Sequence, residues 1–316
     1  MKIVEVGKND ENQSIEKFMK KFFKTMPSSL IYKFLRKDCV KVNGKHVKSG
    51  FELNYQDKIT FYIQDEFFDR SEYELDFLKA KVDFHSIYED ENIILINKQP
   101  GIRMHDDKEH KIDTLLSQVK KYLYKKNEYH PNEENVFSPA FCNRIDTNTA
   151  GIVIAAKNAE ALRTMNEHIK NDEVKKFYLC VCEGKFAKKS DTLIGFLIKD
   201  EVNNKVRIFT EPKADAKKVV TYYRVLEEKG NLSLVEVQLL TGRSHQIRAH
   251  LASIGNPVAG DLKYGHMSHE FHHQALCSYK IKFDFHEPGM FDYLNQKTFQ
   301  IPIVRFSNKF VVSNKG

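Results

Sequence analysis

The stretch FCNRIDTNTAGIVIAAKN, residues 141–158, joins a polar loop to a run of apolar residues. Gly151 to Ala156 is predicted to be a buried strand, because a short apolar run bounded by polar turns is typical of a sheet interior. A strand anchored in the core holds the preceding loop rigidly, and that loop carries Arg144 and Asp146 two positions apart. A positioned carboxylate is what a nucleophile or a general base requires. On this stretch alone, an Arg–Asp pair that only stabilises the loop is an equally good interpretation.

A second segment, LLTGRSHQIRAHLASIGNPVAGDLKYG at residues 239–265, favours the chemical interpretation. We expect a strand to end at Thr241-Gly242 and a helix to begin near Ser244 and run to Gly255, a good helix stop. The predicted core-facing side chains of this helix are Ile247, Leu251 and Ile254. The polar side chains beside them are Arg243, His245, Gln246, Arg248 and His250. They offer more hydrogen-bonding capacity than packing needs, and Arg243 lies at a strand-to-helix junction, where side chains commonly meet clefts.

Length and composition limit the possible classes of protein. A chain of 316 residues with 41% hydrophobic and 29% charged residues is typical of a soluble protein with two domains. No apolar run approaches the roughly 18 residues of a membrane span. The first residues, MKIVEVGKNDENQ, lack the apolar core of a secretory signal. We therefore expect a cytoplasmic protein with no membrane contact and, by default, a monomer. The five scattered cysteines are expected to be free, since their spacing suits neither a zinc ribbon nor a disulfide framework.

The positive charge is concentrated in the first fifth of the chain. Residues 1–64 hold 13 Lys and Arg against 7 Asp and Glu, whereas residues 65–316 are nearly balanced. Two amphipathic segments, SIEKFMKKFFK and SSLIYKFLRK, predict helices, and the Asn-Gly pair in CVKVNGKHV predicts a tight hairpin turn. The basic side chains that crowd this module are Lys33, Arg36, Lys37, Lys41, Lys45 and Lys48. One sign of charge on a helix exit and a hairpin favours a phosphate-contacting surface over an ordinary solvated face.

The remaining chain predicts an α+β domain built on a mixed, mainly antiparallel sheet. Strand and helix patterns after residue 82 do not alternate regularly, as they would in a doubly wound fold. No Gly-rich phosphate loop is present, so we expect no nucleotide cofactor. The predicted division is an RNA-binding domain at 1–64, a polar linker at 65–81 and a catalytic domain at 82–316. His266, His269 and His273 have a spacing that could suit a metal, but a loop near RNA is the preferred interpretation, and no metal is expected.

Five spaced segments resemble one known family. NRIDTNTAGIVI together with GRSHQIRAHLASIGNPVAGDLKYG resembles the RluA family of pseudouridine synthases. YEDENIILINKQPGIRMH, VKKFYLCVCEG and HHQALCSYKIKF resemble further segments of that family, in family order over residues 85–285. Residues 13–63 resemble the small RNA-binding domain named after the fourth protein of the small ribosomal subunit. That combination resembles the ribosomal-RNA branch of the family, the RluC and RluD type.

The resemblance implies a role for particular side chains. Asp146 matches the catalytic aspartate, and Arg144 matches the arginine that helps to hold the flipped nucleotide or its vacated place. Tyr178 matches the tyrosine that packs on the target base, and Arg243 matches the basic residue that pairs with the catalytic carboxylate. His245, Gln246 and Arg248 are expected to contact RNA. The sequence departs from the family where Asn143 replaces a usual histidine and Ala150 a common serine.

The implied reaction is isomerisation of uridine to pseudouridine in RNA, with large-subunit ribosomal RNA as the expected substrate. It requires an ionised carboxylate near the ribose and an aromatic ring beneath a base that has left its stack. It requires no metal, nucleotide or redox group. Asp146 could attack the ribose or remove its 2′ proton, and the sequence leaves both steps open. The alternatives are a synthase acting on transfer RNA and an inactive RNA-binding factor of ribosome assembly.

Overall fold

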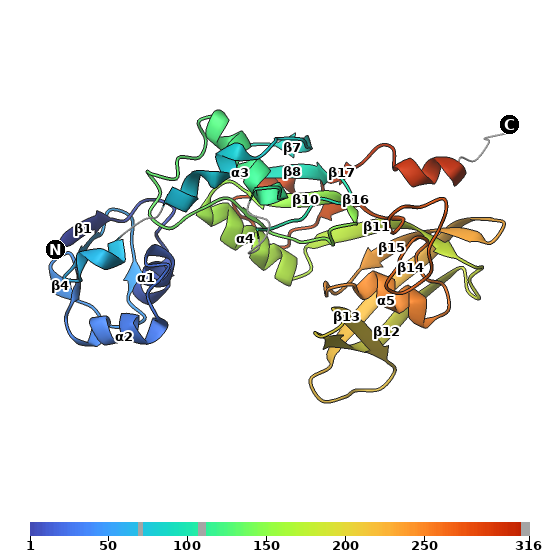
Figure 1. Ribbon diagram of the computed structural model, residues 1–316, viewed down its shortest axis with the longest axis horizontal. Coiled ribbons are helices and arrows are strands. Elements are labelled where there is room, and N and C mark those ends of the chain that lie inside the picture. Colours follow the sequence, from blue (N-terminus) through green and yellow to red (C-terminus); the bar gives the residue numbers. More distant parts are fainter. Residues whose placement is uncertain (69–71, 107–111, 311–316) are drawn as a thin grey trace.

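The computed structural model describes residues 1–68, 72–106 and 112–310. Figure 1 shows a small N-terminal unit next to one end of a long sheet. From the other end project β12 (Ser190–Asp200) and β13 (Lys205–Phe209), an antiparallel pair that we call the arm. The molecule is therefore elongated, with the N-terminal unit at one end and the arm at the other.

The N-terminal unit packs two helices against a four-stranded sheet of order β1-β6-β3-β4. The predicted apolar helix faces are buried, as Phe18 and Met19 of the first helix and Leu35 of the second show. Asn43 and Gly44 have φ angles of 50° and 77°, which confirms the predicted tight turn. The elements are β1 (Lys2–Glu5), β2 (Gln13–Ser14), α1 (Ile15–Phe22), α2 (Ser28–Arg36), β3 (Val40–Val42), β4 (Lys45–His46), β5 (Glu52–Leu53) and β6 (Lys58–Phe61).

The large sheet has the order β13-β12-β14-β15-β11-β16-β10-β8-β7, with β9 on β10 and β17 on β16. Among these named strands of the described chain, only β10 and β16 pair in parallel. The prediction of a mixed, mainly antiparallel α+β domain is therefore confirmed. The remaining strands are β7 (His85–Glu89), β8 (Ile93–Lys98), β9 (Ala140–Phe141), β10 (Ala150–Ala156), β11 (Val174–Glu183), β14 (Lys217–Lys229), β15 (Leu232–Leu239), β16 (Leu276–Phe283) and β17 (Thr298–Gln300).

The central strands are buried on both faces because the sheet lies between two apolar cores. Ile94 and Ile96 of β8 join one core, and their neighbours Ile93 and Leu95 join the other, as alternation along a strand requires. Helix α3 (Leu115–Lys125) covers the first face and α4 (Ala159–Lys170) covers the second. Further helical segments are α5 (Gln246–Ser253) and the 3₁₀ turns η1 (Asp65–Phe68), η2 (Glu72–Lys79), η3 (Asp292–Leu294) and η4 (Arg305–Phe310).

Two local predictions need correction. Helix α5 begins at Gln246 and ends at Ser253, instead of running from Ser244 to Gly255, because His245 has a left-handed backbone with φ of 54°. Ile254 consequently lies beyond the helix and is 39% exposed, whereas Ile247 and Leu251 are buried as predicted. The polar linker predicted at residues 65–81 contains η1 and η2, and its Phe77 packs into the core of the large sheet.

Candidate active site

Asp146 lies on the loop between β9 and β10, and the surrounding backbone fixes that loop. Asn143 Oδ1 accepts a hydrogen bond from Ile154 N at 2.8 Å, which ties the start of the loop to β10. Thr149 N donates to Asp146 O at 3.0 Å. A Cβ at Gly151, where φ is 123°, would lie 2.3 Å from Ser278 O, so only glycine allows β10 to approach β16 this closely. The carboxylate is thus presented from a rigid support.

Lys98 supports the same loop from inside the protein. Its side chain is fully buried, and Nζ donates to the carbonyls of Thr147 at 2.7 Å, Ile102 at 2.9 Å and Gln99 at 3.0 Å. Burial lowers the pKa of Lys98 to about 8, an effect that the nearby Asp146 carboxylate opposes. The lysine therefore joins the loop after β8 to the loop that carries Asp146.

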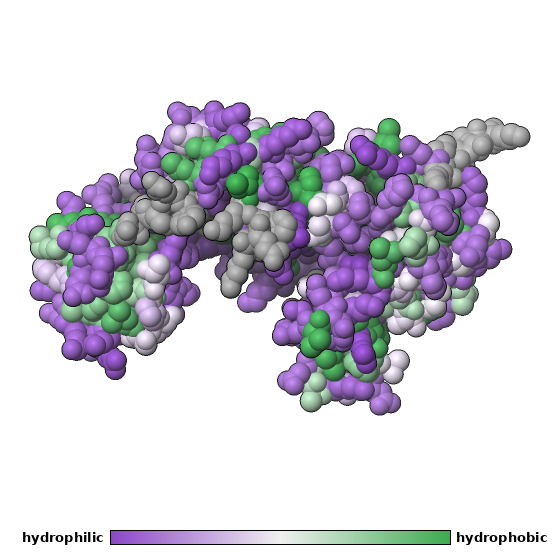
Figure 2. Space-filling model, in the orientation of Figure 1, coloured by the Kyte–Doolittle hydropathy of each residue, from purple (hydrophilic) through white to green (hydrophobic). Residues whose placement is uncertain are grey.

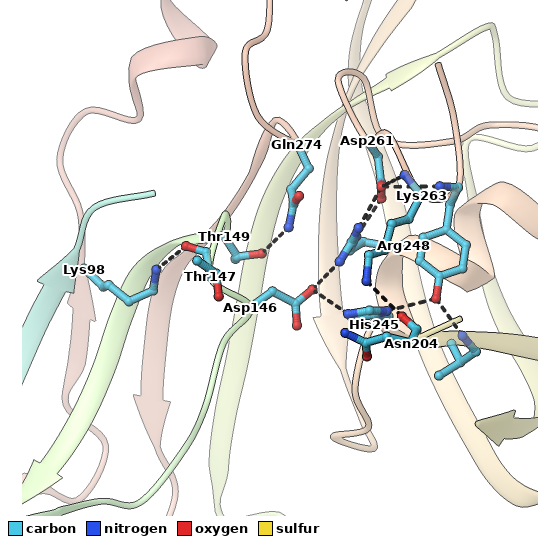
Figure 3. A network of polar contacts seen from close by, with 12 residues as sticks. Lys98, Asp146, Thr147, Thr149, Asn204, His245, Arg248, Asp261, Lys263 and Gln274 are labelled. Carbon is cyan, nitrogen blue, oxygen red and sulfur yellow. Dashed lines mark hydrogen bonds and ion pairs between the residues drawn. The ribbon is translucent and has the colours of Figure 1, made fainter. Parts of the chain in front are cut away.

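The cation paired with Asp146 is Arg248. Its Nη1 donates to Asp146 Oδ2 at 2.7 Å, while Nε and Nη2 donate to the two oxygens of Asp261 at 2.6 and 2.7 Å (Figure 3). Asp261 is fully buried. Burial alone would lower the pKa of Arg248, but the hydrogen bonds and charges of Asp261 and Asp146 outweigh it, and the net shift is upward. The bidentate bond to Asp261 fixes the plane of the guanidinium, and with it the direction of the bond to Asp146.

The expected pairing of Arg243 with the carboxylate is wrong in this structure. Arg243 is exposed, and its backbone N–H donates to Gln246 Oε1 at 3.2 Å. Because α5 begins after His245, the side chain that points from its first turn toward Asp146 is that of Arg248. Arg248, which was expected to contact RNA, is 5% exposed and fully engaged by the two carboxylates.

Gln246 also has a structural environment instead of the expected RNA-facing one. The side chain is 2% exposed. Its Nε2 donates to Val220 O at 3.1 Å and Thr221 Oγ1 at 3.0 Å, and its Oε1 accepts from Thr241 Oγ1 at 2.9 Å. These contacts join the start of α5 to the first residues of β14 and to the segment just after β15. His245, in contrast, is half-buried, with Nε2 3.9 Å from Asp146 Oδ2.

Tyr178 lies on β11 beside the parallel pair β10 and β16. The strand has a register shift between Phe177 and Tyr178, and Tyr178 pairs with Ser278. The ring is 5% exposed, and burial raises the pKa of its hydroxyl, an effect that a hydrogen bond with Ser278 opposes and the Asp146 charge reinforces. The phenol therefore stays protonated. The charge of Asp146 acts on this hydroxyl, whereas the packing of the Tyr178 ring on a target base stays a prediction.

Comparison with known proteins decides the family. A family model described as RNA pseudouridylate synthase matches residues 92–253. An uncharacterized RNA pseudouridine synthase of Mycoplasma genitalium is 32% identical over 97% of this chain and 95% of its own length. The chain is an RNA pseudouridine synthase of the RluA family. The family resemblance drawn from the motifs is thereby confirmed, and the protein is an isomerase that acts on RNA.

Other relatives and solved structures agree with this family. The ribosomal large subunit pseudouridine synthase D of Borreliella burgdorferi is 31% identical over 78% of this chain and 72% of its own length. The structure of human RNA Pseudouridylate Synthase Domain Containing 4 has a TM-score of 0.55 at 20% identity, covering 70% of this chain and 89% of the human one. The structure of human RNA Pseudouridylate Synthase Domain Containing 1 has a TM-score of 0.52 at 21% identity, covering 74% of this chain and 97% of the human one. The two structures establish that the fold is shared.

The other predicted RNA contacts of this synthase lie on its surface. Arg144 is exposed, and its charge helps burial to lower the pKa of His105. In the N-terminal unit the predicted basic side chains are exposed at Lys33, Arg36, Lys37, Lys45 and Lys48. Lys41 is partly exposed. Among the described residues no His, Cys, Asp or Glu cluster is arranged to hold a metal ion. In the same part of the chain, no helix is long and apolar enough to cross a membrane.

The sequence analysis missed three members of the site. Lys98, Asp261 and Tyr264 all stand within the motifs that carried the family resemblance, but none was given a place beside the carboxylate. A signal for Asp261 does exist, because an acidic residue in the Gly-flanked stretch GDLKYG follows a helix that buries an arginine, and a buried arginine needs such a partner.

Proposed function

We propose that this synthase converts uridine to pseudouridine in large-subunit ribosomal RNA and that Asp146 is its catalytic carboxylate. The observation that carries the proposal is the unequal environment of the two carboxylate oxygens. Oδ2 accepts the hydrogen bond of Arg248, whereas Oδ1 has no hydrogen-bond partner among the described residues. A fixed carboxylate with one engaged and one open oxygen is suited to act on a ribose.

The neighbouring groups support each step of the reaction. The bond between ribose C1′ and base N1 breaks, the base turns, and a bond forms from C1′ to base C5, after which the C5 proton leaves. The open oxygen of Asp146 acts on the ribose, either at C1′ or at the 2′ position. Tyr178 provides an aromatic surface beneath the extruded base, which recovers part of the stacking free energy that the base loses. Arg248 fixes the direction of the carboxylate through its hydrogen bond to Oδ2 and places a positive charge beside it.

The choice of ribosomal RNA is supported by the relatives and by charge. Relatives named ribosomal large subunit pseudouridine synthase C or D match 78% or more of this chain. The basic side chains of α2 and the β3–β4 hairpin form a surface suited to RNA phosphates. Figure 2 shows an indented outline between the N-terminal unit and the arm, surrounded mostly by hydrophilic residues. A folded RNA held by the N-terminal unit can therefore approach the large sheet along a polar face.

The test is release of tritium from RNA labelled at uridine C5. Unmodified large-subunit ribosomal RNA and transfer RNA are incubated separately with the native enzyme and with Asp146→Ala. The proposal predicts release from ribosomal RNA alone and none with the variant. Release from transfer RNA alone would contradict the substrate assignment, and undiminished release with Asp146→Ala would contradict the assignment of the carboxylate.

A further inference from the structure

A short chain of polar contacts leads from the arm to Asp146. Val206, at the start of β13, donates its backbone N–H to Tyr264 Oη at 2.7 Å. Tyr264 Oη lies 2.9 Å from His245 Nδ1, and His245 Nε2 lies 3.9 Å from Asp146 Oδ2 (Figure 3). The four residues come from β13, the loop after α5, the residue before α5 and the catalytic loop. Elements far apart in the sequence thus meet in one line.

The hydrogen-bond pattern assigns the tautomer of His245. The Tyr264 hydroxyl accepts from Val206 and has one proton to donate, and His245 Nδ1 is the acceptor within reach. With Nδ1 accepting, the ring hydrogen is on Nε2, which faces Asp146. Burial lowers the pKa of His245, an effect that the charge of Asp146 opposes and the charges of Arg248 and Lys263 reinforce, and the net shift is downward. The ring is therefore neutral near pH 7 and presents an N–H to the carboxylate.

The loop that carries Tyr264 is bonded to the arm on one side and to the catalytic centre on the other. Lys263 Nζ donates to Asn204 O at 2.9 Å, in the turn between β12 and β13. On the opposite side Asp261 holds Arg248, and the Tyr264 ring lies 5.2 Å from the Arg248 guanidinium carbon. Both groups that face Asp146 Oδ2 therefore contact residues 261–264. A displacement of the arm changes the support of both.

His245 has an unusual backbone that fits this role. Its φ of 54° and ψ of 13° place it in the left-handed region, which residues other than glycine rarely occupy. The conformation ends the preceding loop, starts α5 at the next residue and directs the ring edge-on to Tyr264, with ring centroids 5.7 Å apart. Rare backbone conformations are kept where the surroundings require them, and here they position an imidazole beside a carboxylate.

We infer that Tyr264 and His245 are positioning residues that couple the seating of the arm to the geometry of Asp146, an inference that rests on the proposed catalytic role of Asp146. In this structure the 3.9 Å separation is too long for a hydrogen bond. Lys205 and Arg207 flank Val206 and are exposed. RNA phosphates drawn to these cations move β13, and the Tyr264 hydroxyl transmits that movement to His245. His245 Nε2–H then becomes a second donor to Oδ2, leaving Oδ1 for the ribose.

The first test is Tyr264→Phe, which removes the hydroxyl and keeps the ring. Single-turnover tritium release at saturating enzyme is measured from pH 5 to 9, together with the Kd for the same RNA. We expect the rate to fall about 10- to 100-fold with the Kd within about twofold, because misplacement of a catalytic group costs rate before affinity. We also expect the acid limb of the pH–rate profile to move to higher pH, since His245 Nδ1 is then free to take a proton. Tyr223→Phe, a buried tyrosine whose hydroxyl donates to Lys188 O, is the matched control and should leave both properties unchanged.

The second test examines coupling to the arm. The double change Lys205→Gln/Arg207→Gln should lower the saturated rate in the native enzyme and have little further effect in Tyr264→Phe or in His245→Gln. A native rate and pH profile in Tyr264→Phe, or full additivity of the arm and Tyr264 changes, would overturn the inference. Asp146→Asn is assayed in parallel. If this variant stays active, the proposed function fails. If it is inactive and Tyr264→Phe behaves as the native enzyme, only the coupling fails.

Discussion

At the scale of single residues, the arrangement of Asp146, Arg248 and Asp261 is the most informative feature. Two carboxylates share one buried guanidinium, and only Asp146 is in part exposed, with a side chain 25% accessible. Asp261 is surrounded by protein and serves to orient Arg248. This division leaves Asp261 as a buried support and Asp146 as the accessible carboxylate, in accord with the proposed catalytic role of Asp146.

The two arginines of the RSHQIR stretch should therefore differ sharply. Arg248→Met should lower the single-turnover rate by at least about 100-fold, because it removes the donor to Oδ2 and leaves Asp261 buried without its partner. Arg243→Met is the matched control and should reduce the rate less than about tenfold, since its side chain does not contact the carboxylate. Rates are compared at saturating enzyme after thermal unfolding has shown that both variants are folded. Equal losses in the two variants would contradict this assignment.

The same residues show why the sequence identified the carboxylate and not its partner. Asp146 precedes an unmistakable buried strand, so its rigid placement could be predicted. The partner depended on where α5 begins, and a shift of two residues turns a helix face by about 200°. His245 adopts a left-handed backbone although it is not a glycine, so the local sequence gives no signal for this conformation. The buried role of Lys98 was likewise invisible, because three carbonyls from two loops converge on it only in the folded chain.

At the scale of elements, α5 is bonded to β14 by a buried polar contact and packs against β12 of the arm. His250 Nδ1 lies 2.8 Å from Thr221 Oγ1 on β14, and a Cβ at Gly195 of β12 would lie 3.1 Å from His250 Nε2. Burial lowers the pKa of His250 to about 4. The absence of a side chain at Gly195 thus lets β12 approach the imidazole, and the packing requires the neutral ring.

This packing makes stability depend on pH. The folded-state pKa of His250, about 4, is below the ordinary value of 6.5, so the unfolded chain binds a proton that the folded chain rejects between these values. The contribution is present above pH 6.5 and is lost as the pH falls toward 4. When the pH falls from 7.5 to 5.0, the free energy of unfolding should decrease in both proteins. The decrease should be about 2 kcal/mol larger in the native protein than in His250→Gln. Urea titrations at the two pH values measure this difference, and the same pH dependence in both proteins would exclude His250 as its source.

At the scale of the whole molecule, polar side chains join the N-terminal unit to the large sheet. Asn9 Oδ1 accepts from Ala159 N at 3.0 Å, at the start of α4. Asn135 Nδ2 donates to Asp10 Oδ2 at 2.6 Å, and Val136 packs against the N-terminal core. The segment that makes these contacts leads directly to β9 and the catalytic loop. The N-terminal unit is thereby held at a defined place relative to Asp146, which suits the proposed role of that unit in binding RNA.

The basic surface of the N-terminal unit should contribute affinity more than rate. In the triple variant Lys33→Gln/Arg36→Gln/Lys37→Gln, RNA binding should weaken. The slope of the logarithm of the association constant against the logarithm of the salt concentration should decrease in magnitude by about 2 to 3. The saturated single-turnover rate should change less than about threefold, because the changed side chains lie outside the catalytic site. The matched control neutralises Lys282, Lys297 and Lys229, and should leave the slope within about 1 of the native value. An unchanged slope in the first variant would exclude this surface as a phosphate contact.

Much of the architecture could be predicted because local pattern and global fold agree. The N-terminal unit, the mixed sheet and the family followed from amphipathic faces, the Asn-Gly turn and five ordered segments. The arm's relation to the catalytic loop could not be predicted, since Val206, Tyr264 and His245 meet through contacts between segments that are distant in the sequence. Such contacts depend on how the sheet curves and where the long strands end, which single-residue patterns do not specify.

The most direct measurement is the single-turnover rate of tritium release from a large-subunit ribosomal RNA fragment with Asp146→Asn. This change keeps the size of the side chain and removes its charge. The account predicts a loss of at least about 1,000-fold in rate, with a Kd for the RNA within about threefold of the native value. A variant that binds the RNA and releases tritium at nearly the native rate would contradict the central claim that Asp146 is the catalytic carboxylate.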